Sequence, residues 1–322
     1  MDETNLRRVI NAYQVSQALH VAATLRIADR LGEGARSVEE LAAETDTHAP
    51  SLYRLLRALA SVGVFHEDDH RRFSLTPLGD ELRSDGLGAW AEFVGRPHHW
   101  QAWGALLHSV RTGENAFRQV HGVDVWQFRA ERPEESALFD RAMTSLTRGV
   151  IAAVLDAYDF GRFGTVVDVG GGSGAFLAAL LDRHPAMQGV LFDQPHVVEG
   201  AVVPERCRVV AGSFFEAVPD GGDAYVLKSV IHDWEDEEAV AILRTCRRAV
   251  PADGVVLLVE RELGPPNSGA DGKFLDLTML TNAGGRERTL DEYAMLFERA
   301  GFRLAGATPS ASGFSVIEAA PA

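Results

Sequence analysis

Cysteine and long apolar runs are both scarce in this chain of 322 residues. Its two cysteines, Cys207 and Cys246, are not spaced as a metal-binding or redox motif, which favours a reduced, cytoplasmic protein over a disulfide scaffold. No apolar run reaches the roughly 18 residues that a membrane span needs, and the first residues lack the basic and apolar segments of a secretory signal. We therefore expect a cytoplasmic protein that has no membrane partner.

Positive charge is also in deficit. There are 31 Lys and Arg residues against 46 Asp and Glu, for a formal net charge of −15, which disfavours binding to a phosphate backbone. Residues 37–83 nevertheless have the pattern of a winged helix-turn-helix. From Arg36 to Arg83, however, six arginines stand against nine acidic residues, whereas a DNA-reading module needs a basic face. We expect this segment to serve dimerisation or to form a wall of a substrate site, with no nucleic-acid partner.

Local patterns predict the elements of the N-terminal region. Apolar residues at helical spacing predict a helix over residues 5–31, apolar on more than one side, which indicates burial against a partner chain or a second layer. Ser37 and Glu40 have the spacing of a capping box at the start of the next helix. The runs 64–65 and 72–75 predict a hairpin that completes the winged helix.

Beyond about residue 161, strand-like runs alternate with helical patterns. The predicted strands are residues 165–169, 190–193, 207–211, 224–228, 254–260, 302–308 and 314–319. This alternation predicts a mostly parallel, doubly wound α/β sheet with a final antiparallel strand. Residues 89–157 look helical, with a loop near 112–123, and are rich in aromatic residues that pack in a core or line an aromatic pocket.

The most informative motif is the glycine-dense turn of residues 166–174, VVDVGGGSG. A β-branched run, a tight turn and the start of a helix let a ligand approach the backbone, because glycine tolerates positive φ. A second acidic residue, Asp193, follows the next predicted strand at the distance typical of a ribose-binding carboxylate. The GGGSG pattern favours S-adenosylmethionine over NAD. The carboxylate of Asp168 either holds the turn or reaches the ammonium group of that cofactor.

His232 is the candidate for acid–base chemistry. It follows the fourth strand of the sheet, and ligands of open α/β sheets bind beyond the carboxyl ends of the strands. A histidine base needs an acceptor on its other ring nitrogen, and either Glu260 or Glu287 is placed at a strand or loop end to supply it. Both glutamates also have arginine neighbours with which to pair. The acidic run 235–238 reads as a helix N-terminus, so no metal is expected.

Four elements in order make the chain resemble the S-adenosylmethionine-dependent O-methyltransferases of the plant caffeate and bacterial antibiotic-tailoring type. They are VDVGGGSG at 167–174, LFDQPHV at 191–197, IHDW at 231–234 and GGRERT at 284–289. The resemblance covers almost the whole chain. It implies a winged-helix dimerisation domain over residues 1–95, a helical linker over 96–157 and a Rossmann-like cofactor-binding domain over 158–322. It also implies a homodimer.

The same resemblance implies roles for individual residues. It places the general base at His232, flanked by Glu260 and Glu287. Cofactor contacts are implied at Asp168, Gly170, Gly171, Gly172, Asp193, Gln194, Ser213, Phe214, Lys228, Ser229 and Thr147. Substrate-facing positions are implied at Phe139, Met143, Asp233, Met279 and Asn282. In this scheme Asp193 binds the ribose hydroxyls and the Phe214 ring covers the adenine.

One position departs from the family. Ser213 stands where many members have an aspartate that holds the adenine amino group, and a neutral acceptor makes a weaker hydrogen bond than a charged one. The expected reaction is metal-independent transfer of a methyl group to a phenolic hydroxyl of an aromatic secondary metabolite: a polyketide, a quinone or an aromatic amino-acid derivative. The alternative is a tailoring enzyme that binds the same cofactor without transferring its methyl group, such as a hydroxylase or decarboxylase.

Overall fold

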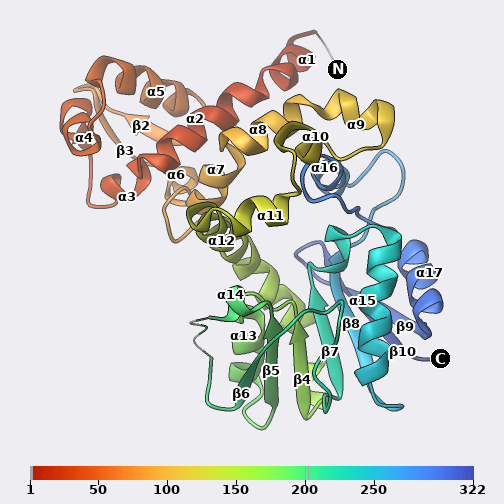
Figure 1. Ribbon diagram of the computed structural model, residues 1–322. Helices are drawn as coiled ribbons and strands as arrows, with labels where there is room; N and C mark the ends of the chain where they lie inside the picture. Colours follow the sequence, from red (N-terminus) through yellow and green to blue (C-terminus); the bar gives the residue numbers. More distant parts are fainter. Residues whose placement is uncertain (1–2, 200, 202) are drawn as a thin grey trace. The chain divides into compact units, whose positions relative to one another are not determined.

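The computed structural model describes the backbone of residues 3–199, 201 and 203–322 (Figure 1). The chain folds as two compact units, the first formed by residues up to 101 with 128–146, and the second by 102–127 with the described residues from 147 onward. Residues 96–157 therefore contribute to both units. None of the described helices is long and apolar enough to cross a membrane.

The first unit is mainly helical. Its elements are α1 (Glu3–Ile10), α2 (Ala12–Thr24), α3 (Ile27–Leu31), β1 (Arg36–Ser37), α4 (Val38–Thr45), α5 (Ala49–Ser61), β2 (Phe65–Glu67), β3 (Arg72–Leu75), α6 (Pro77–Asp80) and α7 (Gly88–Val94). Parts of α8 (Pro97–Gly104), α11 (Val125–Ala130) and α12 (Pro133–Ala157) complete it. The strands form a small antiparallel sheet in the order β1-β3-β2, so helices and a wing lie together as predicted.

Short-range chemistry explains where α4 begins. The Ser37 hydroxyl accepts the Glu40 N–H at 3.2 Å, and the Glu40 carboxylate accepts the Ser37 N–H at 2.7 Å, which is the predicted capping box. The single helix predicted over residues 5–31 is wrong, because the chain forms three helices there. Arg26 has a left-handed backbone with φ 51°. Apolar spacing indicates which side chains face the core, but it is insensitive to a change of direction at one residue.

The second unit contains a seven-stranded sheet. Its strands are β4 (Thr165–Val169), β5 (Gln188–Asp193), β6 (Cys207–Ala211), β7 (Ala224–Lys228), β8 (Val255–Arg261), β9 (Phe302–Pro309) and β10 (Phe314–Pro321). Their order is β6-β5-β4-β7-β8-β10-β9. The first five are parallel, and β10 lies antiparallel between β8 and β9. The predicted Rossmann-like, doubly wound fold is confirmed.

Helices cover both faces of this sheet, with α15 (Asp236–Ala249) and α17 (Leu290–Ala300) on one face and α13 (Ala175–Arg183) on the other (Figure 1). The second unit also contains α9 (Leu106–Thr112), α10 (Ala116–His121), η1 (Phe160–Arg162), α14 (Pro195–Val198), η2 (Ile231–Asp233), α16 (Ala270–Thr278) and η3 (Met279–Ala283). Val167 and Val169 of β4 pack in the core that contains α15 and α17, whereas Val166 packs in the core with α12 and α13. Alternate side chains of one buried strand thus serve two apolar layers.

The loop expected near residues 112–123 is only partly a loop. It contains α10, whose first turn is capped by Asn115, because the side-chain oxygen accepts the Arg118 N–H at 2.9 Å. Gly113 ends the preceding helix and Gly122 ends α10, both with left-handed backbones. The two glycines obscured a helix of six residues, which is too short to show a clear apolar period.

Candidate active site

The glycine turn joins β4 to α13 at the carboxyl end of the sheet. Gly170, Gly172 and Gly174 have φ of 72°, 59° and 80°, a region that side chains rarely adopt. A Cβ added at Gly171 would lie 2.5 Å from Leu191 and 2.6 Å from the Asp168 carboxylate, whereas one at Gly172 would meet nothing within 4 Å. One side of the turn is therefore filled by the protein, and the other is open for a ligand.

Two carboxylates hold this turn and border it. One oxygen of Asp193 accepts the Gly172 N–H at 2.9 Å, and the other accepts the Gln194 N–H at 2.7 Å. Asp168 is buried at 1 % exposure, and its Oδ2 has no hydrogen-bond partner among the described residues. Burial raises the pKa of Asp168 to about 7, against the opposing charge of Lys228. A carboxylate with one unpartnered oxygen next to the glycine turn suits a cationic group such as the ammonium of S-adenosylmethionine.

Lys228 is the last residue of β7, next to this turn, and Ser229 directly follows it. Burial lowers the pKa of Lys228, whereas the charges of Asp168 and Glu260 act in the opposite direction. Ser229 has a left-handed φ of 55°, an uncommon conformation for a residue other than glycine. Its N–H donates to the Val259 carbonyl of β8 at 3.0 Å. This strained residue turns the chain out of β7 toward the segment that carries His232.

Aromatic rings gather beyond β6 and η2. Phe214 and Phe215 contact each other at 5.1 Å between ring centroids, and both meet the Trp234 ring edge-on at 5.9 and 4.8 Å. Trp126 stacks on Trp234 at 6.1 Å with an interplanar angle of 16°. Ser213 accepts the Phe215 N–H at 3.3 Å. Such a group of rings offers planar apolar faces to a flat ligand.

His232 lies in η2 among three carboxylates. Its Nδ1 is 2.7 Å from Glu287 Oε1 and 3.9 Å from Glu260 Oε2, and its Nε2 is 3.7 Å from Asp233 Oδ1. Of the two glutamates that the sequence left open, Glu287 is the one within hydrogen-bonding distance of the ring. The Nε2 atom lies 3.7 Å from Asp233 Oδ1, beyond hydrogen-bonding distance.

Glu260 holds the backbone instead of the ring. Its Oε1 accepts the N–H groups of Val230 and Ile231 at 3.0 and 2.9 Å, and it is fully buried at the end of β8. Burial raises the pKa of Glu260 to about 7, against the charge of His232. The carboxylate therefore supports the start of η2 and adds its field to the histidine from 3.9 Å.

These charges decide the protonation of His232. Burial alone lowers the pKa of His232, but the charges of Glu260 and Asp233 and the hydrogen bond that the ring donates to Glu287 raise it to about 10. The net direction is upward because several anions surround one cation, which favours the charged form. The ring therefore carries a proton at neutral pH when no ligand is bound.

The loop that carries Glu287 was recognised in the sequence, but its supports were not. The Glu287 N–H donates to Asp276 of α16 at 2.9 Å, and the buried Arg288 contacts Asp236 of α15. The sequence marks Asp236 only as part of an acidic helix N-terminus and does not mark Asp276, so only long-range contacts reveal how they support this loop. The sequence offers Arg288 only as one of the arginines with which Glu260 or Glu287 could pair, and the described residues show no ion pair of Arg288 with either glutamate.

The predicted substrate-facing residues fall in both units. Met279 and Asn282 lie on η3, a π-helical turn of the second unit, and both are buried. Asn115 ties α10 to this turn, because its Nδ2 donates to the carbonyls of Leu280 and Asn282 at 3.1 and 3.3 Å. π-helical turns occur frequently at functional sites.

Phe139 and Met143 belong to the part of α12 within the first unit, where they pack against the apolar cluster that contains Phe93 and Leu138. Thr147 begins the part of α12 within the second unit. The remaining predicted site residues all belong to the second unit.

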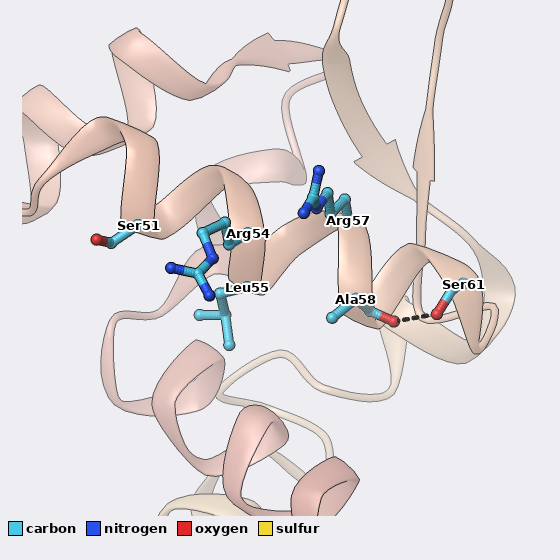
Figure 2. A pocket seen from close by; sticks show the side chains of 6 residues that line it. All are labelled: Ser51, Arg54, Leu55, Arg57, Ala58 and Ser61. Carbon is cyan, nitrogen blue, oxygen red and sulfur yellow. Dashed lines mark hydrogen bonds between the residues drawn. The ribbon is translucent and has the colours of Figure 1, made fainter.

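A surface hollow of the first unit lies apart from these residues. It has a volume of about 750 Å³ and is lined by Ser51, Arg54, Leu55, Arg57, Ala58 and Ser61 of α5, as Figure 2 shows. The hollow contains none of the predicted site residues. Within the described part of the chain, no group of three or more His, Cys, Asp or Glu side chains is arranged to hold a metal ion.

Two family models and several known proteins match this chain. Residues 103–303 match the model of the O-methyltransferase domain, and residues 8–85 match that of the O-methyltransferase dimerisation domain. A phenazine O-methyltransferase from Lysobacter antibioticus is 44 % identical over 98 % of this chain and 95 % of its own. The aclacinomycin 10-hydroxylase RdmB of Streptomyces purpurascens is 38 % identical over 94 % of this chain and 86 % of its own.

One similar protein has been solved with S-adenosylmethionine bound. The O-methyltransferase NcsB1 of neocarzinostatin biosynthesis, in complex with S-adenosylmethionine and 2-hydroxy-5-methyl naphthoic acid, superposes with a TM-score of 0.80 at 38 % identity, covering 96 % of each chain. The glycine turn, the orphaned Asp168 and the extent of both family matches converge on one conclusion. The chain belongs to the O-methyltransferase family and is an S-adenosylmethionine-dependent enzyme with a dimerisation domain in its N-terminal region.

Proposed function

We propose that this enzyme methylates a phenolic hydroxyl of an aromatic secondary metabolite, with His232 as the proton acceptor. The observation that carries the proposal is the hydrogen bond of 2.7 Å between His232 Nδ1 and Glu287 Oε1. It fixes the ring with Nε2 available, which is the arrangement of a histidine base and its orienting acid. The phenazine O-methyltransferase relative and the neighbour solved in complex with a naphthoic acid support an aromatic acceptor.

The chemistry requires little beyond orientation and one proton transfer. The bound S-adenosylmethionine supplies an electrophilic methyl group on a sulfonium. The phenolic oxygen forms the new O–CH₃ bond as the S–CH₃ bond breaks, the electron pair of that bond stays on sulfur in S-adenosylhomocysteine, and the phenolic proton passes to His232 Nε2. A phenol has a pKa near about 10, so the histidine gains the proton at little cost and contributes typically about 10²–10⁴-fold.

The raised pKa of His232 has a kinetic consequence. Because the pKa of the His232 imidazole is about 10, the ring must lose a proton before it can accept one from the phenol. Alternatively, the phenol binds as its anion. In both cases the reactive complex carries one proton less than the complex that dominates at neutral pH. The rate therefore rises with pH up to the pKa of His232. Glu287 and Glu260 stabilise the imidazolium that results from the transfer.

We assign the cofactor site to the residues around the glycine turn. Asp193 is oriented by the turn and is suited to the ribose hydroxyls, and Asp168 is suited to the ammonium group. Phe214 belongs to the ring cluster beside Trp234 and is suited to the adenine. The further cofactor contacts that we propose are Gly170, Gly171, Gly172, Gln194, Ser213, Lys228, Ser229 and Thr147.

For the acceptor we propose contacts with Asp233, Met279 and Asn282 from the second unit and with Phe139 and Met143 from the first. We also propose that the enzyme is a homodimer. The match to a dimerisation domain supports this, as do the exposed apolar side chains of α1 and α2, among them Val9 at 65 % and Tyr13 at 53 % exposure.

The test is calorimetric titration of the purified protein with S-adenosylmethionine and S-adenosylhomocysteine, followed by methyl transfer to a panel of hydroxyphenazines, hydroxynaphthoates and hydroxyquinones. Micromolar binding with transfer to one member supports the proposal. His232→Gln then loses turnover and keeps cofactor binding, and a variant with normal turnover removes His232 from the base role. Binding without transfer to any member favours the non-methylating alternative, to which the hydroxylase relative belongs.

A further inference from the structure

Arg288 is a charged side chain with 1 % of its surface exposed. A guanidinium in such a place is costly unless every donor finds an acceptor. Its partners lie in two segments on either side of His232. Nη1 donates to the Ile231 carbonyl at 3.1 Å, and Nη2 donates to the Trp234 carbonyl at 2.8 Å. Nε and Nη2 also donate to Asp236 Oδ1 at 3.0 and 2.8 Å.

The backbone of the same loop contacts His232 itself. The Arg286 N–H donates to the His232 carbonyl at 2.8 Å. A Cβ added at Gly285 would lie 2.1 Å from that carbonyl oxygen. The loop can therefore pack this closely against His232 only if residue 285 is glycine. The loop that carries Glu287 thus holds two carbonyls of η2, those of residues 231 and 232, and the carbonyl of residue 234 directly after it.

This arrangement matters because η2 is a 3₁₀ turn of three residues. Such a turn has poor internal hydrogen-bond geometry and few bonds of its own. Its position is therefore set by its partners, Glu260 at the start and Arg288 along the carbonyl side.

We propose that Arg288 is a positioning residue for His232, whose guanidinium holds η2 against residues 284–289 and so keeps Nδ1 within hydrogen-bonding distance of Glu287. The inference deepens the proposed function and rests on the role of His232 as the base. It predicts that a guanidinium is needed at this position and that positive charge alone is insufficient. A planar fork with five donors spans acceptors on both sides of the histidine, whereas an ammonium is a point charge with three donors.

The test compares Arg288→Lys with a matched control, Arg299→Lys. Arg299 also pairs with an acid of the first turn of α15, because its Nη2 lies 2.6 Å from Glu237 Oε1, but it is exposed at the surface. Three measurements are made on full-length protein: binding of S-adenosylhomocysteine by calorimetry, titration of the His232 ring by NMR on protein with ring-labelled histidine, and kcat against pH. The His232 signal is assigned by its loss in His232→Gln.

We expect Arg288→Lys to bind S-adenosylhomocysteine within about threefold of the original protein, while the pKa of His232 falls by at least about one unit and kcat falls at least about tenfold. The direction follows because a weaker contact with Glu287 removes stabilisation of the imidazolium. Arg299→Lys keeps all three values. An Arg288→Lys protein whose histidine titration and kcat match those of Arg299→Lys overturns the proposal.

Should Arg288→Lys not fold, Asp236→Ala carries the test. Asp236 is not among the groups that chiefly shift the pKa of His232, and its Oδ1 accepts both Nε and Nη2 of Arg288, so Asp236→Ala loosens the hold on the guanidinium without changing position 288. A lowered pKa of His232 supports the positioning role, and an unchanged one overturns it. The NMR titration needs no acceptor. If His232→Gln keeps its turnover, the proposed base role fails, and the titration still decides whether Arg288 positions the ring.

Discussion

At the scale of single residues, the site is governed by how charge is distributed around His232. Glu287 contacts the ring, and Glu260 contacts the backbone ahead of it. The two glutamates thus have different roles, because Glu287 lies in a loop that reaches the ring and Glu260 lies at the end of a buried strand next to the backbone.

Glu287→Gln tests the field on the histidine. Removing the anion that lies 2.7 Å from Nδ1 lowers the pKa of His232 from about 10 toward its ordinary value. The pH at which kcat levels off should therefore move down, while maximal kcat falls roughly 10- to 100-fold because a weaker partner supports the imidazolium. The measurement is kcat from pH 6 to 10.5. An unshifted profile would show that Glu287 does not set the charge of His232.

Ser213→Asp tests the departure from the family pattern. A carboxylate accepts a hydrogen bond about twice as strongly as a neutral hydroxyl, so the variant should bind S-adenosylhomocysteine roughly fivefold more tightly in calorimetry. Ser213→Ala serves as the control and should bind no more tightly than the original protein. Equal affinity of Ser213→Asp and the original protein would argue against a contact between this position and the adenine.

At the scale of elements, the loop of residues 284–289 and the turn η2 behave as one piece. Each is short and irregular, and each obtains its position from the other through Arg286, Arg288 and Gly285. The strands β7 and β8 bring the two segments to the same end of the sheet, where ligands of such folds bind.

Gly285→Ala separates these two segments. The added methyl group would overlap the His232 carbonyl oxygen and the Asp233 backbone at 2.1 and 2.3 Å, and backbone atoms have little freedom to move away. We expect kcat to fall at least about tenfold with cofactor binding retained, since a misplacement of about 1 Å is that costly. Gly306→Ala in β9, where a Cβ meets nothing within 4 Å, is the control. Normal kcat in Gly285→Ala would contradict the close packing.

At the scale of the whole molecule, stability depends on ionisable groups outside the catalytic cluster. His99 on α8 is 7 % exposed and packs edge-on against Phe93 at 5.3 Å. Burial, helped by the charges of His98 and Arg129, lowers the pKa of His99 to about 3. In the unfolded chain this histidine has a pKa of about 6.5. Between that pH and about 3, His99 is therefore protonated in the unfolded chain and neutral in the folded protein.

His99→Gln tests this coupling. Between about pH 6.5 and pH 3 the unfolded state binds more protons at this residue, so His99 makes the free energy of unfolding fall as the pH falls. The variant should show a shallower decline of stability across this window, with no difference in slope above pH 7. Urea unfolding at several pH values measures it, and the exposed His70→Gln is the control. Equal slopes in the two variants would place His99 in a solvated environment.

By itself the sequence determined the alternation of strands and helices, the glycine turn, the capping box and the motif that contains His232. These depend on residues close together in the chain, where apolar period, glycine and capping chemistry act directly. The break at Arg26, the helix α10 and the placing of β10 between β8 and β9 depended on packing instead. The different contacts of Glu260 and Glu287 and the hydrogen bonds of Arg288 to the backbone of η2 also depended on packing. Those contacts join residues 29 to 57 positions apart, and only the folded sheet brings them within reach.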